Sequence, residues 1–484
     1  MRRLSSPLLG PFSLAMINVA AIASLRDLPQ MAKYGTGCIF FYLLAGLVFF
    51  FPVSLVAAEL ATGWPERGGV YVWVREAFGK QHGFAAVFMQ WFQNLCWYPV
   101  VLTFAAASLA FAVDPQQGAA RLAENKLYIC TVILITYWGT TLWNFRGLKA
   151  SAKLSMVGAF SGVIVPGAAL IVLAVLYVAF GNASHLHPTV DGFLPDMASP
   201  GNITFAASVL LAFAGMEMTA VHVRETRNPN RAYPLAIGIS AGVILLAFIL
   251  GALAIAVALD PDQYTLQTGV TKALDSMLSS FSIPYLGRIF AAMMALGVVG
   301  SVNSWVIGPS KGLLAAARDG MLPKWFQKAN DQGVPTRVLL IQASIVSLLC
   351  LTFTLQPTVA DAYFMLSDLT IQLYLIMYMA MFTAAIRLRY KRPLTPRPFR
   401  IPFGNTGMWA VAGLGILGAL ACITVGFFPP TQLASQGIRP HVFVGFLTGG
   451  ILTVTAIPYG IQHLLRHKKY LLPDNEEPVA ARRK

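Results

Sequence analysis

Apolar stretches of about twenty residues recur along the whole chain, and each can cross the roughly 30 Å hydrocarbon core of a bilayer as an α-helix. Only 11% of the 484 residues are charged, whereas a soluble domain carries roughly 25%. We therefore expect an all-α membrane protein with about twelve transmembrane helices. The expected spans are residues 8–33, 37–62, 83–113, 127–145, 153–180, 202–223, 233–259, 287–316, 336–356, 361–386, 407–428 and 441–465.

Basic residues are distributed unevenly between the connecting loops. When the loops are assigned alternately to the two sides, 28 of the 35 lysines and arginines fall on the side of the N-terminus and six on the other, with Arg26 in the membrane. Positive residues collect on the cytoplasmic side of membrane proteins. We therefore expect a multi-pass protein of the cell membrane (bacterial inner membrane) with both termini cytoplasmic. The same asymmetry accounts for the net charge of +15, so no nucleic acid is expected as a partner.

The spans form one predicted transmembrane domain, residues 1–466, followed by a short cytoplasmic tail, 467–484. Spans one to five occupy residues 8–180, spans six to ten 202–386, and spans eleven and twelve 407–465. The first apolar segment lacks a small-residue cleavage site, so we expect it to stay as a span. The five cysteines are an odd number and lie in or beside apolar spans. We expect no disulfide framework, metal site or cofactor.

Two of the spans are interrupted. In the first, a run of small residues, Ala20, Ala21, Ala23 and Ser24, leads into Arg26, Asp27 and Pro29. In the sixth, Gly215 comes two residues before Glu217. Irregular backbone at membrane depth is tolerated only where protein or a wet cavity satisfies it. Interrupted spans at corresponding positions of two halves are typical of the central site of a secondary transporter. No residue-level repeat between the halves is visible.

Four segments carry a resemblance to a known family. They are INVAAIASLRDLPQMAKYG (17–35), PERGGVYVWVREAFGKQHGF (65–84), GMEMTAVHVRETRNPNRAYPLAI (215–237) and GLLAAARDGMLPKWFQKANDQGVPTR (312–337). Together they resemble the amino acid-polyamine-organocation (APC) superfamily, and most closely its glutamate/GABA antiporter branch. The resemblance implies a five-plus-five inverted-repeat (LeuT-like) fold with broken spans 1 and 6. It also implies secondary active transport of an amino acid by alternating access, through exchange or coupled to protons.

The resemblance places the substrate between the two broken spans. Many relatives have a glycine-rich break in span one, whereas this chain has alanines and a serine there, as the antiporter branch does. A lysine of the kind that some relatives use in the fifth span is absent between residues 159 and 167. The expected substrate-binding residues are Ala21, Ala23, Ser24, Arg26, Phe213, Ala214 and Gly215.

Three ionisable residues of the sixth span are candidates for proton coupling or gating. Glu217 lies mid-span, where an unpaired charge costs roughly 2.5–3.5 kcal/mol, so a functional role is the default expectation. A purely structural glutamate bonded to its neighbours is the alternative. His222 and Glu225 follow toward the cytoplasm and form either a gate pair or an interfacial polar cluster.

Arg26 is expected to select the substrate. A guanidinium in a membrane span needs an anionic partner or a wet cavity, because it does not lose its proton. Adjacent Asp27 would point about 100° away if the backbone were helical, and a permanent pair with Glu217 would make Arg26 structural. The functional alternative is that the planar guanidinium binds the side-chain carboxylate of a glutamate-like substrate through two parallel hydrogen bonds.

Aromatic residues near the expected site carry weaker signals. Phe213 could cover a bound substrate, or its ring could simply face the core or lipid. Trp97, Tyr98, Tyr374 and Tyr378 are candidates to line the cavity. In a chain with 12% aromatic residues such coincidences are frequent.

Other functional classes fit less well. We find no catalytic constellation for an enzyme and no repeated filter-like loop for a channel. Within transporters, a proton-coupled symporter of neutral or cationic amino acids is the alternative to an antiporter. The sequence is compatible with a homo-oligomer. Membrane lipid is an expected partner. A basic cluster directly after the tenth span is expected to anchor the chain at the cytoplasmic surface. Its members are Arg387, Arg389, Lys391, Arg392, Arg397 and Arg400.

Overall fold

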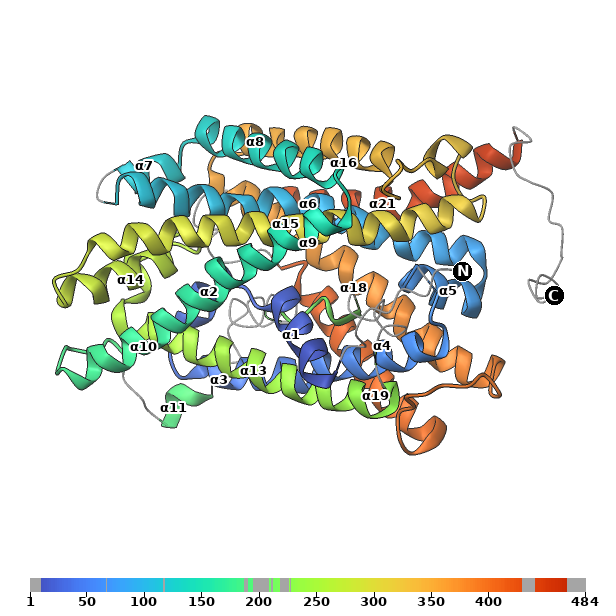
Figure 1. Ribbon diagram of the computed structural model, residues 1–484, viewed down its shortest axis with the longest axis horizontal. Coiled ribbons are helices and arrows are strands. Elements are labelled where there is room, and N and C mark those ends of the chain that lie inside the picture. The colour runs from blue at the N-terminus through green and yellow to red at the C-terminus, as the bar shows by residue number, and fades with distance from the viewer. Residues whose placement is uncertain are drawn as a thin grey trace.

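The computed structural model describes residues 10–66, 68–115, 118–186, 190–194, 209, 212–217, 226, 228–428 and 440–467. The regular elements of these residues are helices (Figure 1). In chain order they are α1 (Pro11–Ile22), α2 (Leu28–Ala32), α3 (Gly37–Ala45), η1 (Gly46–Phe50), α4 (Phe51–Gly63), α5 (Val70–Phe78), α6 (Lys80–Val113), α7 (Gly118–Ala123), α8 (Lys126–Asn144), α9 (Leu148–Ala159), η2 (Phe160–Ile164), α10 (Val165–Ala179), α11 (Val190–Phe193), α13 (Pro229–Ala258), η4 (Pro261–Gln263), α14 (Gly269–Ser280), α15 (Tyr285–Arg318), η5 (Lys324–Gln327), α16 (Thr336–Leu349), α17 (Leu351–Leu355), α18 (Val359–Lys391), α19 (Gly404–Val425) and α21 (Pro440–His467).

Nine helices of the described residues are long and apolar enough to cross a membrane, which confirms the expected helical, multi-pass class. They are Gly37–Gly63, Lys80–Val113, Ala150–Ala179, Arg231–Ala258, Tyr285–Arg318, Thr336–Leu355, Val359–Lys391, Gly404–Val425 and Pro440–Leu465. Three expected spans remain, numbers one, four and six. Span one corresponds to α1 and α2, and span four corresponds to α8. The sixth falls mostly outside the described residues. The count of twelve and the inverted repeat therefore stay predictions.

The first expected span is interrupted where the sequence predicts it. Helix α1 ends at Ile22, and Ala23 has extended backbone angles (φ −61°, ψ 122°). The chain stays non-helical until α2, which starts with Pro29 in its first turn. A proline there is favourable because its missing N–H would have no partner in the first turn of a helix. Figure 1 shows α1 in the middle of the molecule, between α6 and α15 on one side and α13 and α19 on the other.

The helices divide into a buried core and a lipid-facing periphery. In the most apolar part of each helix, 78% of the residues of α6 and 72% of those of α18 are buried, against 33% in α19 and 22% in α21. A helix that is apolar on all sides and exposed in the protein must face lipid. The buried helices α6 and α18 are therefore the ones positioned to present side chains to a central site.

Helices α9 and η2 pack against α15 without intervening side chains. A Cβ atom on Gly162 would collide with the backbone of Gly297, and one on Gly158 would collide with that of Gly300. Small residues at helix interfaces in membranes let the backbones approach closely. The fifth and eighth expected spans are thus held together along a line on which only glycine fits.

The amphipathic segment after the second expected span forms α5, which packs against the end of α15. Tyr71 Oη donates to Asp319 Oδ2 over 2.7 Å, and Arg75 Nη1 donates to the same oxygen over 2.8 Å. Partial burial lowers the pKa of the Arg75 guanidinium, but the hydrogen bond and charge of Asp319 outweigh that effect, so its pKa is raised overall. The pair therefore ties α5 to the end of α15 in its ionised form.

Candidate functional site

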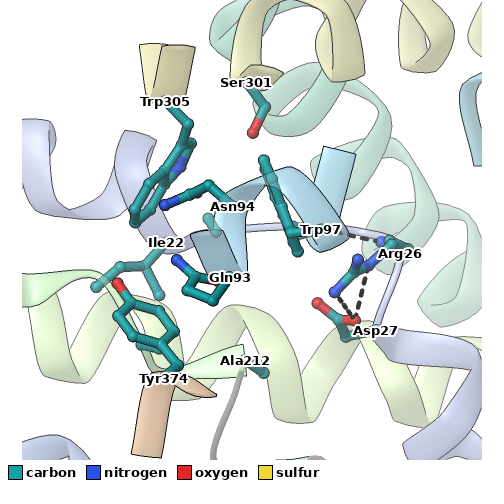
Figure 2. Close-up of a pocket in the computed structure, with 13 residues that line it drawn as sticks. Ile22, Arg26, Asp27, Gln93, Asn94, Trp97, Ala212, Ser301, Trp305 and Tyr374 are labelled. Atoms are coloured by element: carbon teal, nitrogen blue, oxygen red, sulfur yellow. Dashed lines mark hydrogen bonds and ion pairs between the residues drawn. The ribbon is translucent and has the colours of Figure 1, made fainter. Parts of the chain in front are cut away.

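A polar cavity lies beside the interruption of the first span (Figure 2). Residues from the α1–α2 break, from α6, from residues 212–214, from α15 and from α18 line it. The lining residues are Ile22, Ala23, Ser24, Arg26, Asp27, Gln93, Asn94, Trp97, Ala212, Ala214, Ser301, Trp305 and Tyr374. The cavity thus lies between the two interrupted segments, where the transporter interpretation places a substrate.

Arg26 forms an ion pair with its sequence neighbour Asp27. Arg26 Nε and Nη2 both approach Asp27 Oδ1, at 2.9 and 2.7 Å, and the backbone N–H of Arg26 donates to Ser24 Oγ over 3.3 Å. We argued that helical neighbours would not face each other; they do here because residues 23–27 are not helical. A permanent Arg26–Glu217 pair, the other alternative, is not formed in the structure.

One end of the Arg26 guanidinium is left for another partner. The side chain is 7% exposed, and its Nη1 atom is buried without a hydrogen-bond partner in the part of the chain that the structure describes. A buried donor without a partner is costly, by roughly 1–3 kcal/mol and more when it is charged. In Figure 2 this side chain lies next to Trp97 at the edge of the cavity. Arg26 thus lines the cavity and has one guanidinium nitrogen, Nη1, without a hydrogen-bond partner among the described residues.

The part of the lining that α6 and α15 contribute is polar but uncharged and carries two indole rings. Gln93 and Asn94 are buried on α6, and Asn94 Nδ2 donates to the carbonyl of Gln90 one turn earlier. The rings of Trp97 and Trp305 lie 5.9 Å apart between α6 and α15. A side-chain amide donates from its NH2 group to a carboxylate and accepts through its oxygen from an ammonium group. The wall thus suits a small polar ligand of either charge.

Glu217 lies behind the cavity wall and is bound by three side chains. Its Oε1 accepts from Tyr374 Oη over 2.5 Å and from Gln90 Nε2 over 3.2 Å, and its Oε2 accepts from Tyr378 Oη over 2.6 Å. The Tyr378 hydroxyl in turn accepts the backbone N–H of Gly215 over 2.9 Å. The interruption of the sixth expected span is thereby fastened to α18. Since Tyr374 also lines the cavity, one hydroxyl separates Glu217 from the ligand space.

The predicted binding residues are placed as follows. Ala23, Ser24, Arg26 and Ala214 line the cavity, whereas Phe213 and Gly215 are not among the lining residues. The Ala21 side chain, His222 and Glu225 lie outside the described part of the chain. Roles in binding, coupling and gating stay predictions for all of them.

Phe213 is fully buried, in an aromatic cluster next to the cavity. Its ring centroid lies 5.1 Å from that of Phe50, 5.6 Å from that of Phe248 and 6.0 Å from that of Tyr42. In this conformation the ring packs in the core, which was the alternative to a covering role. A covering role would require the ring to leave this cluster.

Several residues that line the cavity, and Gln90, which contacts Glu217, were missed or given little weight from the sequence. Gln90, Gln93 and Asn94 follow one another at spacings of three and one in an apolar span, so they share a helix face; this signal could have identified α6. Trp97 and Tyr374 line the cavity, while the Tyr98 ring packs at a tilt of 43° against that of Tyr137, with centroids 4.8 Å apart. Trp305 had no signal of its own, because α15 contains many apolar residues.

The fold and the cavity define a multi-pass helical membrane protein with a small polar site between interrupted segments. Comparison with known proteins agrees, since the amino acid permease family matches residues 9–451. The chain belongs to this family, within the amino acid-polyamine-organocation superfamily, which confirms the resemblance read from its motifs.

Individual relatives cover nearly the whole chain. The chain is 41% identical to an uncharacterized transporter of Legionella pneumophila over 456 residues, 94% of this chain and 96% of the relative. It is 30% identical to a glutamate/gamma-aminobutyrate antiporter of Lactococcus lactis over 472 residues, 96% of this chain and 92% of the relative. A probable agmatine/putrescine antiporter of the same species is 24% identical over 405 residues, 83% of each chain. The chain is thus similar to transporters of amino acids and of amines.

Proposed function

We propose that the protein is an antiporter that exchanges a glutamate-like amino acid for its decarboxylated product by alternating access. The observation that carries the proposal is the unsatisfied Nη1 of Arg26 at the cavity. A carboxylate is the complementary partner for a guanidinium donor, and charge-assisted bonds of this kind are roughly twice as strong as neutral ones. The glutamate/gamma-aminobutyrate antiporters of similar sequence support the same substrate class.

Asp27 contributes to this recognition by holding the guanidinium in place. Its Oδ1 accepts from Nε and Nη2 of Arg26, which leaves the Nη1 edge of the planar group for the substrate. A fixed donor loses less side-chain entropy on binding than a mobile one. We therefore assign Arg26 the substrate carboxylate and Asp27 the orientation of Arg26.

A polyamine transporter is the less suitable second candidate, although one relative is a probable agmatine/putrescine antiporter. A diamine carries no carboxylate, so its binding would leave Arg26 Nη1 buried, charged and unsatisfied. A neutral amino acid carried by proton-coupled symport would contact the guanidinium through its α-carboxylate alone. Exchange and symport differ in what must be on the far side of the membrane, which makes them separable by experiment.

The proposal includes the arrangement in the membrane. We place the protein in a bacterial inner membrane with both termini cytoplasmic, on the strength of its basic loops. In that orientation Glu217 lies near mid-membrane and the segment with His222 and Glu225 lies on the way to the cytoplasm. Glu217, His222 and Glu225 are the residues that we propose for proton coupling or gating.

Counterflow in proteoliposomes tests the proposed exchange. Vesicles loaded with unlabelled gamma-aminobutyrate, glutamate, leucine, putrescine or buffer alone receive external radiolabelled glutamate. We expect accumulation with the first two loads and little with the others, in the absence of any imposed gradient. Uptake into buffer-loaded vesicles that depends on an imposed proton gradient would establish symport instead. A second set of the same vesicles receives external radiolabelled putrescine instead. Accumulation of putrescine in this set, without accumulation of glutamate in the first, would establish the polyamine alternative.

A further inference from the structure

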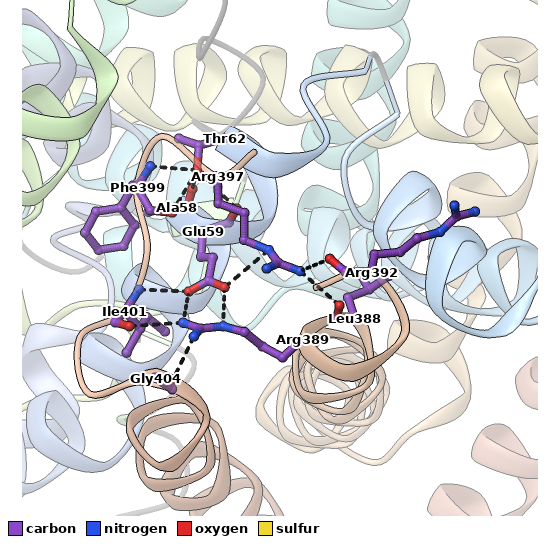
Figure 3. Close-up of polar contacts among 10 residues, drawn as sticks. All are labelled: Ala58, Glu59, Thr62, Leu388, Arg389, Arg392, Arg397, Phe399, Ile401 and Gly404. Carbon is purple, nitrogen blue, oxygen red and sulfur yellow. Dashed lines mark hydrogen bonds and ion pairs between the residues drawn. The ribbon is translucent and has the colours of Figure 1, made fainter. Parts of the chain in front are cut away.

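A cluster of buried ions lies toward one end of the helices α4 and α18 (Figure 3), and none of its residues lines the cavity. Glu59 of α4 accepts from Nε and Nη2 of Arg389 of α18 at 2.6 Å each, and it also accepts the backbone N–H of Ile401 over 2.8 Å. Arg397 Nε approaches the same carboxylate at 3.6 Å. The Glu59, Arg389 and Arg397 side chains are at most 2% exposed.

This cluster fixes the connection between α18 and α19, residues 392–403, which we call the connecting loop. Arg389 donates from Nη2 to the carbonyl of Ile401 and from Nη1 to that of Gly404. Arg397 Nη2 donates to the carbonyls of Leu388 and Arg392, both at the end of α18. The loop is therefore fastened to α18 by these arginine hydrogen bonds, in addition to the burial of its apolar residues Phe399 and Ile401.

Positive charge exceeds negative charge in the cluster. One carboxylate, Glu59, faces the two guanidiniums of Arg389 and Arg397, and Arg400 is close enough to repel Arg397. Burial lowers the pKa of Arg397, and Arg389 and Arg400 lower it further, against the opposite effect of Glu59. Arg392 is 56% exposed, and its nearest carboxylate, Glu76, is 4.0 Å away. Such an excess of charge favours an anionic ligand.

The surface next to this charge is suited to a membrane. Leu394 and Phe403 of the connecting loop are 93% and 87% exposed. Phe403 directly precedes the candidate span α19 and has a left-handed backbone (φ 61°). On the neighbouring helix ends, Trp409 Nε1 donates to Tyr390 Oη over 3.0 Å, and both rings are exposed. Exposed Trp and Tyr residues at span ends are typical of the membrane–water interface.

We propose that the connecting loop binds the phosphate headgroup of an anionic phospholipid through Arg392 and Arg400, with Phe403 inserted among the adjacent acyl chains. The Glu59–Arg389–Arg397 cluster acts as the rigid support that presents these groups. A lipid fits better than a soluble anion because the cations lie beside highly exposed apolar side chains where a span begins. The binding is independent of which amino acid the protein carries.

Lipid titration of the purified full-length protein in detergent tests the proposal. Phosphatidylglycerol or phosphatidylcholine is added, and retained lipid is counted by native mass spectrometry while the unfolding midpoint is recorded. We expect the wild type to retain phosphatidylglycerol preferentially. The double variant Arg392→Gln/Arg400→Gln should lose about 5-fold or more of this preference, since each cation at an anionic surface contributes about 1 kcal/mol. Arg392→Lys/Arg400→Lys should keep most of it.

A matched control removes the same charge elsewhere. Lys324 and Lys328 are exposed cations on another loop, and Lys324→Gln/Lys328→Gln should leave the preference unchanged. Equal losses in the two double Gln variants would show a general attraction to charge and overturn the proposed site. Equal stabilisation by inorganic phosphate, or by an acidic peptide, would likewise overturn a lipid as the ligand. Phe403→Ser keeps every charge, and we expect it to weaken retention of both lipids by a similar factor.

Discussion

Tyr374 connects the cavity to Glu217, because this residue lines the cavity and its hydroxyl donates to Glu217 Oε1 over 2.5 Å. The carboxyl group is therefore one side chain away from any bound substrate. A change in the position of Tyr374 on binding would alter the hydrogen bonding of Glu217. The pair thus offers a physical route by which substrate and a titratable group can influence each other.

Removing the Tyr374 hydroxyl should impair transport more than folding. Tyr374→Phe keeps the ring but leaves Glu217 Oε1 with Gln90 as its remaining side-chain donor. A hydrogen bond to a charged group contributes about 1.5–3 kcal/mol, so we expect roughly a tenfold or larger loss of exchange rate. Tyr98→Phe is the matched control, because the buried Tyr98 hydroxyl has no partner among the described residues. Equal exchange rates in the two variants would show that the Tyr374 hydroxyl has no role in transport.

Glu217→Gln should flatten the pH dependence of uptake. Burial disfavours the charged form of a carboxyl group, while the three donors around Glu217 favour it. The amide of glutamine does not take up or release a proton in this pH range, so it cannot contribute to the pH dependence. Uptake is to be measured in vesicles across pH 5–8, with the amount of folded protein checked by gel filtration. Glu66→Gln changes a half-exposed carboxylate near α5 and should keep the wild-type profile. A Glu217→Gln profile that matches the wild type would leave Glu217 with a structural role.

The glycine contact between the fifth and eighth expected spans should be sensitive to one methyl group. Gly162→Ala places a Cβ against the backbone of Gly297, and overpacking of this kind costs about 1–3 kcal/mol. A lower unfolding midpoint in detergent is the expected result. Gly139→Ala on α8 has open space around the new Cβ and should be neutral or slightly stabilising. If Gly162→Ala is no less stable than Gly139→Ala, the close helix packing is wrong.

Accessibility labelling tests the orientation. Single cysteines in place of Asn330 and Asn475 in a cysteine-free background should react only with reagent on the cytoplasmic side. A cysteine in place of Asn182 should react only from outside. These expectations follow from the uneven distribution of basic loop residues. Labelling of position 330 from the outside would reverse the orientation.

Much of the architecture follows from the sequence because hydropathy is a strong signal at membrane depth. The interruption at residues 23–27 was predictable because Arg26, Asp27 and Pro29 do not continue an apolar helix. The pairing of Arg26 with Asp27 was not, since it depends on backbone angles that follow from that interruption. The Glu217–Tyr374–Tyr378 network joins residues about 160 positions apart. No local pattern indicates such contacts, although each residue was noticed separately.

The ion cluster around Glu59 shows a second limit of sequence reasoning. The basic residues after the tenth expected span indicated an anchor at the membrane surface. Two of them, Arg389 and Arg397, are instead buried against Glu59, a residue that the sequence analysis did not single out. A carboxylate near the end of one span and basic residues at the end of another are compatible with many pairings. The structure selects one of these pairings.

The central claim is that Arg26 binds the side-chain carboxylate of an acidic substrate. Lysine retains the charge but lacks the planar, two-pronged donor geometry. Its electrostatic attraction to Asp27 is therefore kept. Counterflow of labelled glutamate and of labelled glutamine is to be compared in the same vesicles for the wild type and Arg26→Lys. We predict that glutamate exchange falls about tenfold or more relative to glutamine exchange, because one charge-assisted hydrogen bond contributes about 1.5–3 kcal/mol. Equal losses for the two substrates would contradict the claim and leave Arg26 as a structural partner of Asp27.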